Sequence, residues 1–426
     1  MLFVQASTFY KNHAAIIANI VFLLFEKAVA VGLVFFCEGV ISRLLGISLY
    51  GKWLYSINLT ILFSSVALIA GSEVVVPALV RHPRLHWKIL TSVFLLRFSS
   101  AFLAFAIGIC YAFFFVEDQD IKLMLTLLTC AVIFNEPFSV IANFYQAQTK
   151  IGVVVAIRLS VLLLRVLLVF IALSISSTLV IYSTRVMEAL FLAIALCLLI
   201  ISRGGIWDWH KMVSIIMLKR GIMLWIPLIL MLIYMRLDRL FVEYYLGFEE
   251  LAMYGVANQI LEQAVLIISI VVQSIAPIML YGRKVKNIRT VILYILLFTF
   301  FLQLMGWVWL SDIIVLIFGQ HYQPAAALAK MMLPALSFMA VDSILMQRLY
   351  RDGKYILILF KWLFLSIISF FSYWMLLSVF RSGEIYIVYV TNALLMMITS
   401  ILICFTYTYS RQCVRGLDDY NSNTDL

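Results

Sequence analysis

The feature that most constrains this chain is a series of twelve apolar runs, each long enough to cross a bilayer. A transmembrane helix needs about 20 apolar residues, and it must satisfy its own backbone hydrogen bonds because the bilayer core holds no water. The alternating ten-residue segments of a membrane barrel do not occur in this sequence. The runs cover residues 14–36, 53–80, 89–116, 121–145, 151–173, 182–201, 221–246, 251–281, 290–310, 325–349, 355–380 and 385–409.

The composition supports the same interpretation. Of 426 residues, 65% are hydrophobic and 12% are charged, whereas soluble domains are about half apolar and a quarter charged. The short run 313–318 cannot cross a bilayer, and we expect it to lie at the interface. The sequence therefore predicts an all-α polytopic membrane protein with about 12 transmembrane helices.

The distribution of basic residues predicts the orientation of these spans. If Met1 is cytoplasmic, most loop lysines and arginines lie on the cytoplasmic side, as the positive-inside rule requires. Both termini are then cytoplasmic. The net charge of +10 follows from this asymmetry, so it indicates no nucleic-acid partner, although the basic loops could contact anionic membrane lipids.

A short motif occurs once in each half of the chain. Leu45-Gly46 and Tyr50-Gly51 recur as Leu246-Gly247 and Tyr254-Gly255, and Pro77 and Arg81 recur as Pro277 and Arg283. Two halves with the same orientation indicate parallel repeats, an architecture found in transporters. The predicted parts are an N-terminal six-helix lobe (1–204), a cytoplasmic interfacial linker with a short helix (205–220), a C-terminal six-helix lobe (221–410) and a polar cytoplasmic tail (411–426).

The order of three segments carries a resemblance to a known family. They are the Leu-Gly…Tyr-Gly motif, Tyr-Met-Arg-Leu-Asp-Arg-Leu at 234–240 and Ile-Phe-Gly-Gln-His-Tyr-Gln-Pro-Ala at 317–325. With twelve spans, this order resembles the Wzx-like O-antigen flippases. These belong to the polysaccharide transport family of the multidrug/oligosaccharidyl-lipid/polysaccharide (MOP) exporter superfamily. The resemblance implies a MATE-like fold with two six-helix pseudo-repeats around a central cavity.

The resemblance also implies a function and a location. The chain would move undecaprenyl-pyrophosphate-linked oligosaccharide, an O-antigen or related repeat unit for lipopolysaccharide or another surface polysaccharide, from the cytoplasmic to the periplasmic leaflet. It would reside in the bacterial inner membrane and work by ion-coupled alternating access. A polysaccharide polymerase and a chain-length regulator are possible partners.

Basic residues inside the spans are the candidates for binding an anionic substrate, because a charge in the bilayer needs a partner or a cavity. Arg158 and Arg165 lie seven residues apart on one helix face, where they could meet a pyrophosphate or form structural ion pairs. Arg185 and Glu188 are expected to form a surface pair, and Arg239 and Glu243 a local pair. The candidate substrate-binding residues are Lys27, Arg97, Arg158, Arg165, Arg236 and Arg239.

Acidic residues inside the spans are the candidates for ion coupling. Each could carry a coupling ion, H⁺ or Na⁺, or could neutralise an arginine on a neighbouring span. Pro137, Pro227 and Pro277 could let their spans bend. The candidate ion-coupling residues are Glu26, Glu73, Glu136, Asp238 and Glu262.

The sequence is compatible with two other functions. One is a multidrug or cation antiporter of the same superfamily. When charged residues near the span ends are counted with the loops, seven acids and seven bases remain in the spans, and this balance argues mildly against a cation site. The other is an integral-membrane enzyme such as an O-antigen polymerase or glycosyltransferase, but the outer loops are short. The sequence has no phosphate-binding GxxxxGK[ST], HExxH or GxSxG motif, so we predict a protein that is not an enzyme and has no cofactor.

Overall fold

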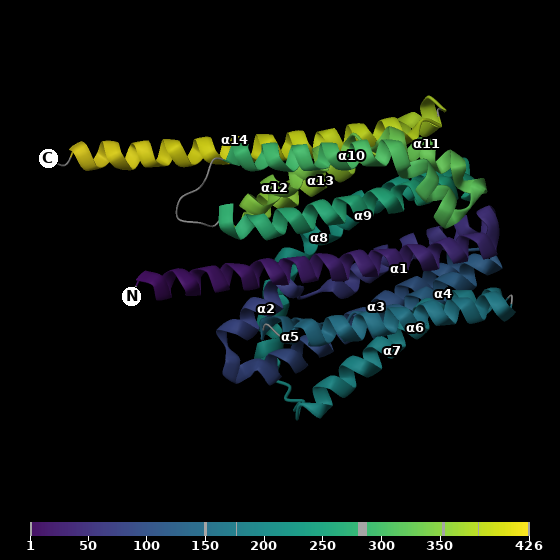
Figure 1. The fold of residues 1–426 in the computed structure, drawn as a ribbon, viewed down its shortest axis with the longest axis horizontal. Helices are drawn as coiled ribbons and strands as arrows, with labels where there is room; N and C mark the ends of the chain where they lie inside the picture. Colours follow the sequence, from purple (N-terminus) through teal and green to yellow (C-terminus); the bar gives the residue numbers. More distant parts are fainter. Residues whose placement is uncertain are drawn as a thin grey trace. The chain divides into compact units, whose positions relative to one another are not determined.

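The computed structural model consists of long helices joined by short turns, and it describes residues 27–148, 151–175, 177–272, 291–347, 349, 354–381 and 383–406. Short segments η1 (Ser65–Leu68), η2 (Pro83–Leu85), η3 (Gln320–Tyr322) and the π-helical η4 (Met375–Val379) adjoin the α-helices. The α-helices (Figure 1) are α1 (Leu2–Ser64), α2 (Ser72–Arg81), α3 (His86–Phe115), α4 (Gln119–Asn135), α5 (Ser139–Ala147), α6 (Ile151–Ile175), α7 (Thr178–Ser202), α8 (Lys211–Leu246), α9 (Phe248–Met279), α10 (Ile288–Phe318), α11 (Gln323–Met332), α12 (Ala335–Arg351), α13 (Tyr355–Trp374) and α14 (Ile385–Thr424).

Within the described residues, ten helical segments are long and apolar enough to cross a membrane. The number is eleven if Gln320–Met332 and Ala335–Gln347, which meet at a bend of 53°, form one span. The segment Lys27–Arg81 is 55 residues long and contains the break at Gly46, so it includes parts of the first two predicted spans. The all-α polytopic membrane fold predicted from the sequence is confirmed.

One predicted span breaks where the sequence gives a physical reason. The predicted span 121–145 is divided into α4 and α5 near Pro137, which has no backbone N–H to donate. Pro227, by contrast, lies inside the uninterrupted α8, and Pro277 lies outside the described residues.

Two local predictions are wrong. The run 313–318 is the end of α10 rather than a separate interfacial segment, because the helix continues through it without a break. The linker also forms no short helix of its own. Residues 205–210 are not helical, and Lys211 already begins the long α8.

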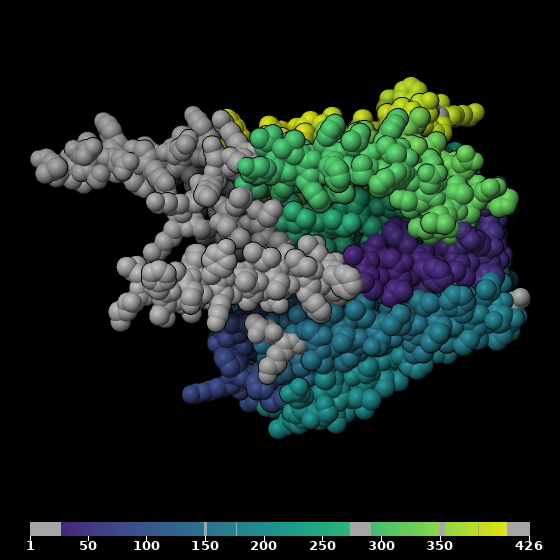
Figure 2. Space-filling model, viewed as in Figure 1, coloured from purple at the N-terminus to yellow at the C-terminus, as the bar shows by residue number. Residues whose placement is uncertain are grey.

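The chain forms two compact units. Unit 1 contains residues Met1–Ile229, Phe248–Met253 and Ile314–Tyr322. In it, α4 packs against α1, α3 and α7, and α6 packs against α1 and α7, so that these helices run side by side (Figure 1). The side chains of α1 and α6 lie directly against each other (Figure 2).

Unit 2 contains residues Leu230–Gly247, Tyr254–Ile313 and Gln323–Leu426. Here α14 packs against α11, α12 and α13, and the buried core includes Leu349, Ile358 and Trp362. The two lobes predicted from the sequence were defined by the repeated motif, whereas these two units are defined by compactness. The predicted lobe boundaries therefore stay a prediction.

Large apolar side chains remain exposed along the helices of both units. Examples are Phe114 and Phe115 at the end of α3 and Phe300 and Phe301 in α10. Soluble monomers rarely expose large contiguous apolar patches because water contact with them is unfavourable. Lipid contact explains such surfaces, as expected of membrane-spanning helices.

Candidate functional site

The repeated motif has a glycine with positive φ in each half of the chain. Gly46 has φ 73° and ψ 174°, and Gly247 has φ 89°. Residues with a Cβ rarely adopt such positive φ values, so glycine is required at both turns. Each turn separates one long helix from the next, and it places the motif tyrosine near a carboxylate on the helix before the turn.

In unit 1 that carboxylate is Glu38 of α1, which is 2% exposed. Tyr50 donates its hydroxyl to Oε2 at 3.5 Å, and Trp53 donates its indole N–H to the same oxygen at 3.3 Å. The other oxygen, Oε1, accepts from Arg165 at 3.0 Å and from Arg185 at 2.7 Å. Glu38 therefore connects α1 with α6 and α7.

The arginine candidates of α6 have different surroundings. Arg165 is 2% exposed and pairs with Glu188 at 3.2 Å as well as with Glu38, whereas Arg158 is exposed. The two side chains therefore do not share one buried environment. The prediction of an Arg185–Glu188 surface pair is wrong, because Arg185 pairs with Glu38 of α1 and Glu188 pairs with Arg165 of α6. Arg165 has the structural ion pairs that the sequence left as one of its alternatives.

In unit 2 the corresponding carboxylate is Asp238 of α8, which is 4% exposed. Its Oδ2 accepts the hydroxyl of Tyr254 at 2.6 Å and the side-chain amide of Asn258 at 2.9 Å. Its Oδ1 accepts the backbone N–H of Arg239 at 2.8 Å. Neutral donors thus satisfy a buried carboxylate that would otherwise be costly in this position.

Two arginines of α8 share one carboxylate of α9. Glu262 Oε1 lies 3.2 Å from Arg236 Nη1 and 2.5 Å from Arg239 Nη2. The prediction that Arg239 pairs locally with Glu243 is wrong, because its guanidinium turns to the neighbouring helix instead. The exposed side-chain fraction is 29% for Glu262, 17% for Arg236 and 7% for Arg239, so this cluster, called the α8–α9 site below, has an accessible side.

Solved structures with a similar fold are membrane transporters. A multidrug resistance MATE family transporter of the MOP superfamily, in an inward-facing conformation, matches with a TM-score of 0.65 and 11% identity over 93% of this chain and 96% of that chain. The lipid II flippase MurJ, in an inward closed conformation, matches with a TM-score of 0.65 and 12% identity over 93% and 87%.

A MOP superfamily transporter from Pyrococcus furiosus matches with a TM-score of 0.58 and 12% identity, over 91% of this chain and 95% of that one. The chain has the fold of the MOP transporters. No family model and no curated protein sequence matches it. These solved structures are described as transporters or a flippase, and the absence of enzyme activity in this protein stays a prediction.

Arg97 donates hydrogen bonds to backbone carbonyl oxygens at two helix breaks of this MOP fold. It is 4% exposed and donates to the carbonyl oxygens of Ile69 at 3.2 Å and Ala70 at 3.0 Å, where α1 and η1 give way to α2. It also donates to the carbonyl oxygen of Glu136 at 3.4 Å, between α4 and α5. Broken helices leave carbonyl groups without intrahelical partners, and Arg97 supplies the missing donors. A substrate-binding role for Arg97 stays a prediction.

The remaining candidates lie apart from the α8–α9 site in sequence. Glu73 is exposed in the first turn of α2, Glu136 is half-buried at the end of α4, and Lys27 is half-buried in α1. Glu26 lies outside the described residues. Within the described part of the chain, no group of three His, Cys, Asp or Glu side chains could hold a metal ion.

Two buried charged groups, Glu38 and the Lys361–Asp342 ion pair, were not predicted from the sequence. Glu38 was not among the candidates, although it precedes Gly46 much as Asp238 precedes Gly247, and the repeat could have identified it. Lys361 is 2% exposed and donates to Asp342 Oδ1 at 2.5 Å, an oxygen that also accepts from Ser400 at 2.6 Å. No pattern in the sequence indicates this buried ion pair, because Asp342, Lys361 and Ser400 lie on α12, α13 and α14.

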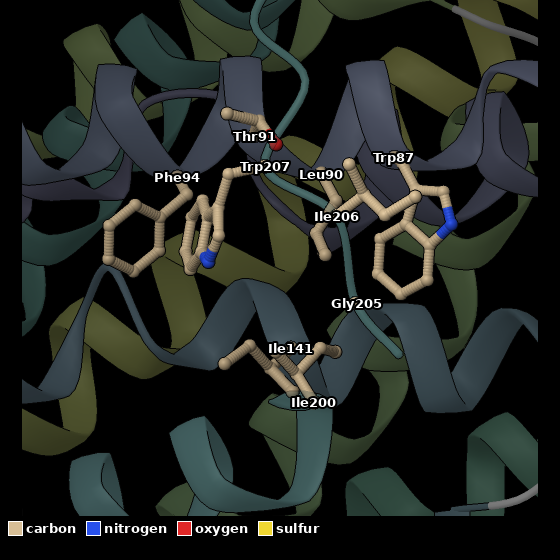
Figure 3. A pocket seen from close by; sticks show the side chains of 9 residues that line it. All are labelled: Trp87, Leu90, Thr91, Phe94, Ile141, Ile200, Gly205, Ile206 and Trp207. Carbon is tan, nitrogen blue, oxygen red and sulfur yellow. The ribbon is translucent and has the colours of Figure 1, made fainter. Parts of the chain in front are cut away.

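A small pocket of unit 1 is not suited to a charged ligand. Its lining residues come from α3, α5, α7 and the linker, and Trp207 packs against Phe94 with ring centroids 4.9 Å apart (Figure 3). Thr91 is the polar residue of the lining, and its hydroxyl already accepts the backbone N–H of Asp208 at 3.1 Å. The pocket therefore offers apolar surface, whereas the α8–α9 site offers charge.

Proposed function

We propose that this chain is a flippase for undecaprenyl-pyrophosphate-linked oligosaccharides, which carries O-antigen or related surface-polysaccharide repeat units to the periplasmic leaflet of the bacterial inner membrane. The MOP fold and the likeness to the solved structure of a lipid II flippase support this class of function. The order of sequence motifs described above supports the O-antigen substrate.

The observation that carries the proposal is the pair Arg236 and Arg239. They lie three residues apart on one face of α8, and a single carboxylate holds both guanidinium groups. Guanidinium groups bind phosphate oxygens through charge-assisted, often bidentate hydrogen bonds. We assign this pair to the diphosphate of the substrate.

Asp238 is our candidate for ion coupling. It lies between the two arginines in the sequence, next to Arg239, and accepts hydrogen bonds from the neutral donors Tyr254 and Asn258. Binding of H⁺ or Na⁺ at Asp238 would change the charge next to the diphosphate site. A membrane potential that is negative inside also favours outward movement of an anion, by about 2.3 kcal/mol per charge per 100 mV. Transport would then proceed by alternating access.

A second candidate function is a multidrug or cation antiporter. The MATE transporter matches with the same TM-score as the lipid II flippase, 0.65, and the buried carboxylate of Asp238 could face a cationic drug. The two candidates differ in the charge of their substrate, so one set of variants distinguishes them.

The test uses purified full-length protein in proteoliposomes that contain a fluorescent undecaprenyl-pyrophosphate oligosaccharide, with pH, Na⁺ and potential gradients imposed separately. We expect transfer by the wild type, a loss of about tenfold or more in Arg236→Gln and Arg239→Gln, and a loss of the gradient response in Asp238→Asn. Arg84→Gln, which changes an exposed arginine of η2, is the matched control and should transfer at the wild-type rate. Ethidium efflux without lipid transfer would support the antiporter instead.

A further inference from the structure

We propose that Glu262 is a built-in competitor for the substrate, a carboxylate that occupies the arginine pair until a diphosphate displaces it. This inference rests on the proposed function, and it assigns a regulatory role within the same site. It follows from the geometry of the ion pairs, their exposure and a comparison with the other network of the molecule.

The geometry places Glu262 where an anionic ligand would bind. Its Oε1 contacts Arg236 and Arg239 at 3.2 Å and 2.5 Å, so one carboxylate oxygen bridges two guanidinium groups from the neighbouring helix. A diphosphate oxygen bound by the same two groups would occupy this position. Because both anions need the same donors, they cannot bind there together.

The charges favour exchange for a ligand with more than one negative charge. Both guanidinium groups contact the single carboxylate of Glu262. The second carboxylate nearby, Asp238, uses both of its oxygens for Tyr254, Asn258 and the backbone N–H of Arg239. A diphosphate matches two positive charges better than one carboxylate does, whereas a neutral or singly charged ligand gains nothing from the exchange.

The exposure of Glu262 also favours its release. Its side chain is 29% exposed, more than either arginine that it bridges. Glu262 can therefore leave the arginines without its carboxylate becoming completely buried, which would be costly for an unpaired charge.

The network around Glu38 provides the contrast. There, Arg165 and Arg185 are balanced by Glu38 and Glu188, and both Glu38 and Arg165 are only 2% exposed. An anion could displace Glu38 only by leaving its carboxylate buried without its ion pairs, which is strongly unfavourable. The carboxylate that bridges two arginines is buried in the Glu38 network but partly exposed in the α8–α9 site, so of these two networks the α8–α9 site is the one suited to exchange.

The experiment measures binding of undecaprenyl pyrophosphate to the full-length protein in nanodiscs, with undecaprenol as the uncharged comparison. We expect Glu262→Gln to bind the diphosphate about tenfold more tightly than the wild type, with no change for undecaprenol, and to flip more slowly because product release is delayed. Glu262→Ala is measured in parallel, because the glutamine amide of Glu262→Gln could itself contact the arginines.

Glu188→Gln is the matched control, because Glu188 is also 29% exposed and paired with an arginine at 3.2 Å. Its affinity for the diphosphate should equal that of the wild type. Binding by the wild type that Arg236→Gln weakens but that neither Glu262 variant strengthens would overturn this inference and leave the proposed function intact. Absence of diphosphate binding by the wild type would overturn both.

Discussion

Tyr254 donates its hydroxyl to Asp238 across the turn at Gly247, at an oxygen-to-oxygen distance of 2.6 Å. Tyr50 and Glu38 make the equivalent contact across the turn at Gly46, at 3.5 Å. In each half, the bond ties the first helix after the turn to a carboxylate on the helix before it. Both halves of the chain therefore contain a glycine turn and a tyrosine–carboxylate hydrogen bond across that turn.

Replacement of Tyr254 by Phe should destabilise the protein by about 1.5–3 kcal/mol, because it removes a hydrogen bond to a buried carboxylate. Thermal unfolding of the purified protein in detergent measures the effect. Tyr244→Phe is the control, since Tyr244 is 78% exposed. Equal unfolding midpoints for the two variants would show that the Tyr254–Asp238 bond contributes nothing.

Gly46→Ala and Gly247→Ala should each cost about 1–3 kcal/mol through backbone strain alone. A Cβ at either position would meet no other atom within 4 Å, so steric contact adds nothing. Gly32→Ala is the matched control, because its Cβ also meets no atom within 4 Å but its backbone is helical. That variant should be stabilised by up to about 1 kcal/mol. The explanation fails if the thermal unfolding midpoints of all three variants change alike.

Glu38→Gln should be among the most damaging single substitutions in unit 1. It leaves Arg165 and Arg185 short of a buried counter-charge, and breaking a buried ion pair from one side costs about 3–5 kcal/mol. Glu188→Gln should cost less, because Glu188 is partly exposed. The yield of folded protein on size-exclusion chromatography and the unfolding midpoint give the comparison, and a larger loss in Glu188→Gln would contradict this ranking.

The contact between Lys52 and Asp118 should make stability depend on pH. Burial raises the pKa of Asp118, but the hydrogen bond from Lys52 Nζ at 2.5 Å and the backbone N–H groups of Ile121 and Asp120 outweigh it and hold the pKa below its ordinary value. A lowered pKa in the folded state contributes stability above the ordinary Asp pKa of about 3.9, and this contribution is lost as the pH falls through the folded value.

Asp118→Asn isolates this charge, because Asn can still cap the N-terminus of α4. We expect the variant to be less stable than the wild type by about 0.2–1 kcal/mol at pH 7, as for a partly exposed ion pair. The difference should disappear as the pH approaches 3. Unfolding midpoints between pH 7 and pH 3 test this, with Glu117→Gln as the exposed neighbouring control. A difference that stays constant down to pH 3 would rule out the titration of Asp118 as its cause.

The sequence by itself determined the class of fold. Apolar runs of spanning length leave helices as the main way to satisfy the backbone in a bilayer. The repeated Leu-Gly…Tyr-Gly motif, visible in the sequence, contains the glycines of both positive-φ turns. These features are local, since they depend on residues close together in the chain, and a pattern of residue types is sufficient to recognise them.

The tertiary structure decided which charges meet. Arg165 pairs with Glu38, which lies 127 positions away in the sequence, and Arg239 turns from Glu243 on its own helix to Glu262 on the next. Helical spacing gives the face on which a residue lies, but not which neighbouring helix covers that face or in what register. For this reason the helical spacing predicted that Arg158 and Arg165 share one face. In the structure, however, Arg165 is buried and Arg158 is exposed.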